Sequence, residues 1–464
     1  MFQSIVKGEW FLLVAGSSFV LLVLTLVGFG RLFRNRMSDH GDEAWALRQS
    51  LDLSLGILAY LVLALIAPEV SVHRPLASLF AVLGWAKGFG LLRFKRGTDR
   101  PGREWAAIIS LSIVLILVIF RSPLEGWDSR SIWFLHSKLI VFSGTTGSAA
   151  GWSLPEFSFS HPDYPRLNSI LSSALFFSPW GSAFVSWSDG LAKGSLVIFF
   201  LAQMAGWVAL PRRTSIGSLA IFCILFMIPG QKAWNGYMDL WTANFGLLGL
   251  LHALCALAGP RFSSHGVQSL VFLALALHCK LEGAVAAACI ICASFLILPV
   301  RQVAGIGIRS LVNRGGWVCL LSVIVWYEIR SRLGVENDLG GVNWSFLSRV
   351  LARATDGQSV VEIFRSLFLS ASHAGVLFLF SFFAVMLGWR RKASREDARM
   401  SGVLLLTGMG YMVFLVVVYL GTPNDLLWHL GTSANRVTLF ATQCWTVSVL
   451  SMSGVWTLSF RDEG

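Results

Sequence analysis

WFLLVAGSSFVLLVLTLVGFG, residues 10–30, is an uncharged apolar run that ends just before Arg31, Arg34 and Arg36. As an α-helix rising about 1.5 Å per residue, it is long enough to cross a hydrocarbon core about 30 Å thick. The run is too long for the apolar core of a signal peptide and leads into arginines rather than a cleavage site, so it predicts a retained membrane anchor. Similar runs recur along the chain, which predicts an integral membrane protein with many spans.

The composition indicates the same class. Hydrophobic residues make up 55% of the 464 residues and charged residues 13%, whereas soluble domains carry roughly 25% charged residues. Backbone polar groups in lipid must bond to one another, and the long Leu, Val, Ile and Ala runs lack the alternation of barrel strands, so we expect an all-α polytopic fold. The net charge of +12 lies mainly between apolar runs, where Lys and Arg set orientation, so we interpret it as topology and expect no nucleic-acid partner.

The apolar pattern predicts about thirteen transmembrane helices. The predicted spans are 10–30, 51–67, 75–92, 104–121, 190–210, 215–229, 239–258, 266–279, 283–299, 316–330, 373–389, 401–420 and 437–458. The basic loops then share one side, which we assign to the cytoplasm, with the N-terminus outside and the C-terminus inside. This count requires that residues 166–180 do not cross the membrane, so we expect a helix that lies in the outer interface or dips part-way into the bilayer.

The same count divides the chain into four predicted parts. These are three N-terminal helices of unclear role in 1–103, a core in 104–330 with its first outer loop at 122–189, an outer loop with interfacial helices in 331–372, and C-terminal helices in 373–464. Every conspicuous motif falls on an outer segment.

The first outer loop opens with Trp127, Asp128 and Arg130, and residues 129–142 have apolar residues at helical spacing. We expect an amphipathic helix on the membrane interface, where Asp128 is either raised in pKa by partial burial or held ionised by Arg130 or Lys138. In either case the carboxylate is a candidate general base. The structural alternative is that Asp128 caps a helix and Trp127 belongs to the interfacial aromatic belt.

Two further predicted outer segments, at residues 161–165 and 237–239, contain ionisable residues. His161-Pro-Asp163-Tyr164-Pro fixes the backbone around a histidine and an aspartate, and we expect it to shape a substrate pocket. Tyr237 and Asp239 lie at the outer end of a predicted span, which places a second carboxylate near the membrane surface.

The remaining two segments contain candidate phosphate ligands. Lys280 and Glu282 lie between two apolar runs, and charges at membrane depth usually face the protein interior. Lys280 either contacts a phosphate with Glu282 orienting it, or the two residues simply neutralise each other. His429 and Arg436 precede the last span, where Arg436 either snorkels to the headgroups or, with His429, binds a lipid-linked phosphate.

Together these motifs resemble those of the GT-C superfamily of membrane glycosyltransferases, especially the bacterial branch near lipid A aminoarabinose transferase and protein O-mannosyltransferase. The resemblance covers residues 104–458 in order. The matching residues are Trp127, Asp128, Ile132, Trp133 and Lys138, then His161–Pro165, then Gly236, Tyr237 and Asp239, then Lys280, Glu282 and Gly283, and finally Trp428, His429, Leu430, Thr432, Ser433 and Arg436. The chain departs from the family in having three extra spans before the first loop and in having His136 where a Lys often stands.

The resemblance implies an inverting glycosyltransferase with a GT-C-like fold. Its donor would be a sugar on a polyprenyl phosphate in the bilayer, and its acceptor a lipid, glycan or protein approaching from outside. Asp128 would be the catalytic general base, while Lys280 and Arg436, with Lys138 or His429, would hold the leaving phosphate. The polarity fits a bacterial inner membrane with a periplasmic site, although a lumenal site in the endoplasmic reticulum would give the same pattern.

The resemblance also implies that Asp163 and Asp239 shape the sugar and acceptor pocket. No cofactor is required by the sequence; a divalent metal is compatible with these two aspartates and Asp128, but no spacing demands it.

Two other functions remain open at this stage. One is an O-antigen ligase or polymerase that uses a lipid pyrophosphate, for which the outer loop 331–372 offers Arg332, Arg349, Arg353 and Arg365. The other is a transporter or flippase, although the chain shows no internal repeat and its ionisable residues gather at the outer side.

Overall fold

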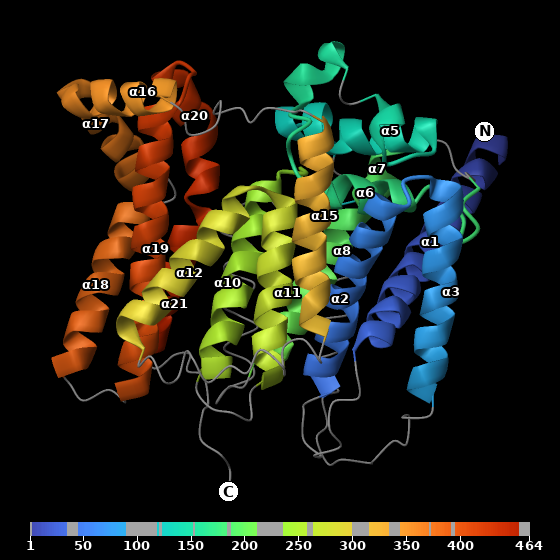
Figure 1. Ribbon diagram of the computed structural model, residues 1–464, viewed down its shortest axis with the longest axis horizontal. Coiled ribbons are helices and arrows are strands. Elements are labelled where there is room, and N and C mark those ends of the chain that lie inside the picture. The colour runs from blue at the N-terminus through green and yellow to red at the C-terminus, as the bar shows by residue number, and fades with distance from the viewer. Residues whose placement is uncertain are drawn as a thin grey trace, which may run out of the picture. The chain divides into compact units, whose positions relative to one another are not determined.

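A computed structural model shows the helices of this chain (Figure 1). It describes residues 2–34, 45–89, 118–119, 123–151, 154–182, 187–210, 235–257, 263–298, 315–333, 344–370, 373–390 and 395–453. These residues are mostly helical and form no named strand; Glu69 and Thr145 make an isolated bridge. The expectation of an all-α protein is therefore confirmed for the described part of the chain.

The predicted spans coincide with helices wherever the structure describes them. Among the described residues, five helices are long and apolar enough to cross a membrane, and a sixth is added if the bent pair Gly357–Leu369 and Ala374–Gly388 is one span. The five are Gly16–Phe33, Leu47–Ile66, Asp189–Val208, Met238–Leu257 and Asp397–Gly421. The predicted spans 104–121 and 215–229 lie, apart from residues 118–119, outside the described residues. The long apolar helices support an integral membrane protein.

The chain forms two compact units, each discontinuous in sequence. Unit 1 comprises Met1–Ala209, Gln231–Tyr237 and Ile308–Gly334, and unit 2 comprises Leu210–Gly230, Met238–Gly307 and Val335–Gly464. The four-part division expected from the sequence stays a prediction.

Unit 1 is built on long helices with short helices joining them. Its elements are α1 (Phe2–Phe33), α2 (Trp45–Ile66), α3 (Val70–Phe89), the π-helix η1 (Ser129–Trp133), α5 (Phe134–Ser143), the 3-10 turns η2 (Ser148–Ala150) and η3 (Pro155–Ser160), α6 (Leu167–Ala174), α7 (Asp189–Ala192), α8 (Gly194–Val208) and α15 (Trp317–Leu333). Helix α6 falls in the segment expected to dip into the membrane. Its eight residues rise only about 12 Å, too short to cross a bilayer.

Glycines allow α1, α2 and α3 to pack closely. A Cβ at Gly56 of α2 would overlap the carbonyl group of Leu26 in α1, and a Cβ at Gly84 of α3 would overlap the carbonyl group of Gly28. Small residues serve this purpose in membranes, where helices associate through close contact because lipid is as apolar as their side chains.

The two ends of α2 differ in charge. Near its start, Asp52 is buried and accepts from Nε of Arg31 at 3.0 Å and Nε of Arg34 at 2.6 Å. Near its end, the carbonyl of Ala64 accepts from the hydroxyl of Thr146, which follows the first outer motif. Ala64 lies twelve positions after Asp52, which corresponds to about 18 Å along the helix. Helix α2 thus contacts Arg31 and Arg34 toward its start and Thr146, which follows the Asp128 motif, toward its end.

Unit 2 contains the remaining long helices. Its elements are α10 (Met238–Leu257), α11 (Ser263–Cys279), α12 (Glu282–Ile297), α16 (Trp344–Thr355), α17 (Gly357–Phe364), the π-helix η7 (Arg365–Ser370), α18 (Ala374–Arg390), α19 (Arg395–Gly421), α20 (Leu426–Val437) and α21 (Leu439–Met452). The predicted outer segments 331–372 and 421–436 therefore contain short helices where the structure describes them. In Figure 1, α16 and α17 lie across the end of α19.

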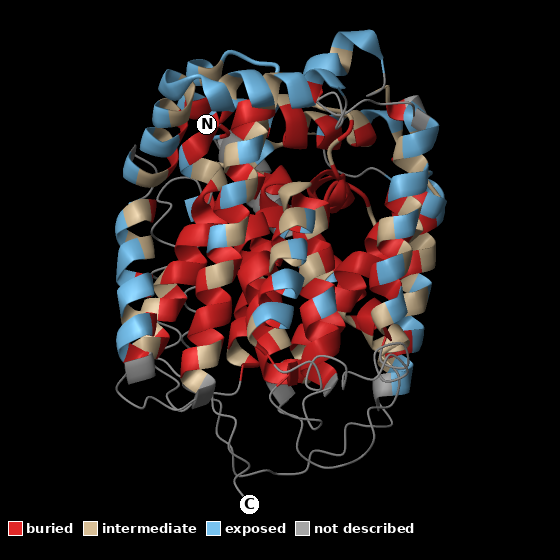
Figure 2. Ribbon diagram, turned by 60° about the vertical axis from the view of Figure 1, so that its left-hand side comes forward, coloured by how far each residue is buried: buried red, intermediate tan, exposed pale blue. Residues whose placement is uncertain are grey.

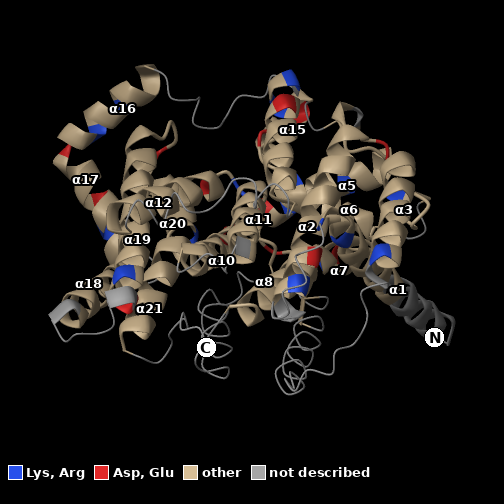
Figure 3. Cartoon of the chain, turned by 60° about the horizontal axis from the view of Figure 1, so that its bottom comes forward, with Lys and Arg blue, Asp and Glu red and all other residues tan. Residues whose placement is uncertain are grey.

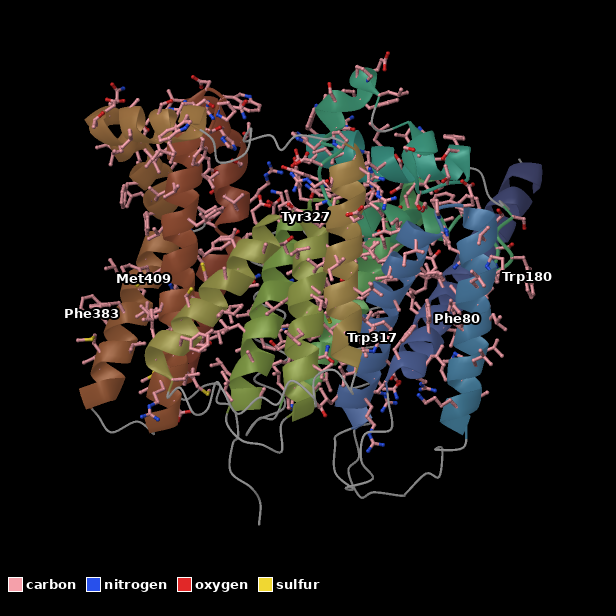
Figure 4. All side chains as sticks on the ribbon, viewed as in Figure 1. Phe80, Trp180, Trp317, Tyr327, Phe383 and Met409 are labelled. Atoms are coloured by element: carbon pink, nitrogen blue, oxygen red, sulfur yellow. The ribbon has the colours of Figure 1, made fainter. Side chains whose placement is uncertain are left out.

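The outer faces of the helices are strongly apolar. On α18, Leu379, Phe380 and Phe383 are 52%, 62% and 57% exposed, while residues between neighbouring helices are buried (Figure 2). Phe383 on α18 and Tyr327 on α15 point outward from their helices in Figure 4. Exposed apolar surface on this scale is typical of contact with lipid.

Candidate functional site

Unit 2 brings four charged residues from three sequence motifs into one cluster, which we call the charge cluster: Asp239, Lys280, Glu282 and Arg436. The ammonium of Lys280 lies 2.8 Å from Oδ1 of Asp239 and 2.9 Å from Oε1 of Glu282. Nη1 of Arg436 lies 3.6 Å from Oδ2 of Asp239. Asp239 therefore bridges the two cations, and the formal charges of the cluster sum to zero.

Helix ends create this cluster. Asp239 lies in the first turn of α10, Glu282 begins α12, and Lys280 stands between α11 and α12 with its backbone N–H donating to the carbonyl of Ala276. A Cβ at Gly283 would overlap the carbonyl group of Ala276, so the glycine lets α12 start directly against α11. The glycine of the Lys-x-Glu-Gly motif thus has a packing role.

The charge cluster is largely shielded from solvent. The side chains of Asp239, Lys280 and Arg436 are 5%, 8% and 13% exposed, whereas that of Glu282 is 24% exposed. Charged residues are sparse on the ribbons (Figure 3), and in this cluster Asp239 and Lys280 are buried while Glu282 and Arg436 are partly buried. Burial strengthens electrostatic interactions and makes each charge depend on its partner.

His429 lies in a second polar group of unit 2. Nδ1 of His429 is 2.9 Å from Oγ1 of Thr422, and its ring centre is 4.9 Å from that of Tyr419. The Tyr419 hydroxyl is 2.6 Å from Oγ of Ser433, which donates to the carbonyl of His429 at 2.7 Å. The last turn of α19 therefore fixes the start of α20, the helix that ends next to Arg436.

Two arginines of α16 hold that turn of α19. Arg353 donates through Nη1 to the carbonyl of Thr422 at 2.7 Å and to those of Tyr419 and Leu420 at 3.2 Å. Arg349 donates through Nε to the carbonyl of Gly421 at 2.8 Å. The last carbonyls of a helix have no partner within the helix and carry negative partial charge, so guanidinium groups are suited to cap them.

In unit 1, Asp128 stands at the N-cap position of η1, but its side chain makes no capping hydrogen bond. It is partly exposed, and the neighbouring Trp127 is 50% exposed with its ring 6.5 Å from that of Phe159. The structural alternative of a capping aspartate therefore lacks the hydrogen bond that defines it.

Tyr237 belongs to the same part of unit 1. The hydroxyl of Ser129 donates to the carbonyl of Asn235, and a Cβ on Gly126 would lie 2.7 Å from the Tyr237 ring. Gly236 has φ +90°, a left-handed conformation that favours glycine, and a side chain there would also press on Ser129. Two distant motifs, those of Asp128 and Tyr237, therefore meet within this unit.

An aromatic stack organises the His161–Pro165 segment. Tyr164 stacks on His161 with ring centres 4.9 Å apart and on Trp133 with ring centres 5.4 Å apart. Asp163, predicted to shape a substrate pocket, is 1% exposed. Because Asp163 is almost fully buried in this conformation, a substrate has little access to its carboxylate.

His136 is fully buried in α5. Ser160 donates its hydroxyl proton to the carbonyl of Phe157 at 2.7 Å, so it accepts from Nε2–H of His136 at 3.0 Å. Burial, with smaller contributions from the charges of Arg166 and His161, lowers the pKa of His136 to about 3. His136 is therefore neutral near pH 7.

The two cations expected near Asp128 are both exposed. The ammonium of Lys138 lies 5.7 Å from the centre of the Trp187 ring, a cation–π distance. Within the described residues, no group of three or more His, Cys, Asp or Glu is arranged to hold a metal ion.

Several site contacts had little signal in the sequence. The stack on Tyr164 and the hydrogen bond of Ser160 join residues with no distinctive spacing. Arg349 and Arg353 did have a distinctive spacing, because residues four apart share a helix face. That spacing also suited ligands for a lipid pyrophosphate, so their role as helix caps was not predicted.

Comparison of the chain with protein-family models, curated proteins and solved structures finds no match.

Proposed function

We propose that this chain is an integral membrane glycosyltransferase with a GT-C-like arrangement of about thirteen spans. It would transfer a sugar from a polyprenyl phosphate to an acceptor on the outer side of a bacterial inner membrane. The observation that carries the proposal is the charge cluster, in which Asp239, Lys280, Glu282 and Arg436 meet although they come from three separate motifs.

The donor phosphate would bind at the charge cluster. Lys280 and Arg436 supply two positive charges, and the Asp239 carboxylate keeps them together when no donor is present. Glu282 is the most exposed member, so it is the group that a phosphate would displace from Lys280. Two fixed cations would then offset the charge that develops on the leaving phosphate.

Asp128 would be the general base that takes the proton of the acceptor hydroxyl as it attacks the anomeric carbon. The partial exposure of the Asp128 carboxylate supports this role. Trp127, half exposed beside it, would offer an aromatic face to the acceptor.

The proposed orientation places the motif-bearing end of each unit outside and the basic ends in the cytoplasm. In unit 2, α19 runs from Arg399 near its start to the turn that contacts His429 at its end. In unit 1, α2 separates Asp52 with its arginines from Ala64. Both patterns follow the tendency of Lys and Arg to remain in the cytoplasm.

Two of the four arginines that favoured a lipid pyrophosphate donor are engaged within the protein, because Arg349 and Arg353 cap α19. The other two, Arg332 and Arg365, are exposed and lie 2.8 Å from Glu328 and 4.0 Å from Glu362. We therefore favour the monophosphate donor.

Transfer of a radiolabelled sugar from polyprenyl-phosphate donors tests the proposal. Purified protein should transfer label, and Asp128→Asn should reduce the rate by about 10²–10⁴-fold. Asp189→Asn, at an exposed aspartate of the same unit, is the matched control and should leave the rate unchanged.

Lys280→Met should raise the donor concentration needed for half-maximal rate, whereas Arg365→Met, at an exposed arginine of unit 2, should not. A folded wild-type protein that transfers label from no monophosphate donor would overturn the proposal. Equal rates for wild type and Asp128→Asn would remove the general-base role from Asp128.

A further inference from the structure

Arg74 in α3 is a buried cation without a carboxylate partner among the described residues. Its side chain is among the largest that are fully buried, and the residue is 1% exposed. Nη2 donates to the carbonyl of Phe177 at 3.0 Å, while Nε and Nη1 have no hydrogen-bond partner in the described part of the chain. Arginine keeps its proton inside proteins, so burial does not remove this charge.

Three other cations of the described residues are compensated by carboxylates. Arg31 and Arg34 share Asp52, and Lys280 is held by two carboxylates. Removing an ion from water without a counter-charge is strongly unfavourable. Arg74 differs from these three cations.

The groups around Arg74 do not supply the missing negative charge. On α2, Tyr60 is fully buried with its ring centre 5.9 Å from the guanidinium carbon. Its hydroxyl lies beside the Arg74 guanidinium, and among the described residues it makes no hydrogen bond of regular geometry. His73 lies with its ring centre 5.7 Å from that of Tyr60, and its Nδ1 contacts the carbonyl of Ala67. Glu69 precedes α3 without an ion pair to Arg74 in the described residues. The start of a helix adds positive potential.

We propose that Arg74 and Tyr60 bind one small monovalent anion of the size of chloride inside unit 1. The unpartnered guanidinium N–H groups and the phenol O–H are donors, and an anion is the ligand that both accepts from them and neutralises the charge. A residue that is 1% exposed leaves no opening for a lipid headgroup, so the ligand is small. The site stabilises the α2–α3 pair and is independent of sugar transfer.

Equilibrium dialysis of purified protein with radioactive chloride, in gluconate buffer, tests this site. The wild type should show one saturable site, and Arg74→Met should lose it. Arg332→Met, at an exposed arginine of the same unit, is the control and should bind as the wild type does. Tyr60→Phe should weaken chloride binding by about tenfold, the effect of losing one donor to an ion.

Thermal unfolding provides a second, independent test of chloride binding. The unfolding midpoint of the wild type should be higher in chloride than in gluconate, and the difference should vanish in Arg74→Met. Chloride binding by folded Arg74→Met with wild-type affinity would overturn the proposal, as would a wild type with no saturable site. If Arg74→Met does not fold, Tyr60→Phe serves as the test variant. An affinity for chloride equal to that of the wild type would then overturn the proposal.

Discussion

Replacing Asp239 by Asn should destabilise the protein more than replacing Glu282 by Gln in the same charge cluster. The change keeps the shape of the side chain but takes a carboxylate from Lys280, 2.8 Å away, and from Arg436, 3.6 Å away. All three side chains are at most 13% exposed. Removing one partner of a buried pair costs about 3–5 kcal/mol, and the partial exposure of Arg436 brings our expectation to about 3 kcal/mol.

Glu282→Gln is the matched control in the same cluster. Glu282 is 24% exposed, and its loss leaves Lys280 still paired with Asp239. A solvent-accessible ion pair contributes about 0–1 kcal/mol, so this variant should unfold near the wild-type midpoint.

The assay is thermal unfolding in detergent, followed by fluorescence of the 19 tryptophans. A loss of 3 kcal/mol corresponds to a fall in midpoint of roughly 6–12 °C for a unit of 150–250 residues. Lys280→Met combined with Asp239→Asn should cost less than the sum of the two single changes, because the double variant no longer buries either charge. An Asp239→Asn midpoint within about 1 °C of wild type, or a larger fall for Glu282→Gln, would refute the reasoning.

Three further predictions concern residues outside the charge cluster. Arg353→Gln should cost about 1–2 kcal/mol and speed hydrogen exchange at the end of α19, because the carbonyls of Tyr419, Leu420 and Thr422 lose their donor; unchanged exchange would contradict this. Gly421→Val should lower the unfolding midpoint, whereas Gly431→Ala should not, since only the former side chain would overlap the Phe346 ring. The pKa of His136 is lowered to about 3, below its unfolded value near 6.5, so the unfolded state binds the proton first and stability falls as pH drops from 6.5 toward 3. His136→Gln should remove about 2 kcal/mol of that loss between pH 6.5 and 4.5, measured as the difference between the two pH profiles of unfolding.

Much of the fold could be predicted because membrane helices are encoded locally. An apolar run of sufficient length must satisfy its backbone hydrogen bonds within itself, so 10–30 or 239–258 indicates a helix without knowledge of its neighbours. The structure places α1 and α10 at those segments. The amphipathic α16 illustrates the limit of the approach. From the sequence, its arginines were candidate ligands for a lipid pyrophosphate. In the structure they donate to the carbonyls at the end of α19.

The sequence by itself determined the membrane class, the positions of the helices and the residues at their ends, because hydropathy and helix termini depend on neighbouring residues. Only the tertiary structure decided that Asp239 pairs with Lys280, 41 residues away, and with Arg436 near the C-terminus. It likewise decided that Arg74 is enclosed without a carboxylate among the described residues. Such partnerships depend on which helices pack together and at what register, and glycines such as Gly56 and Gly283 set that packing through backbone contacts that no local pattern reveals.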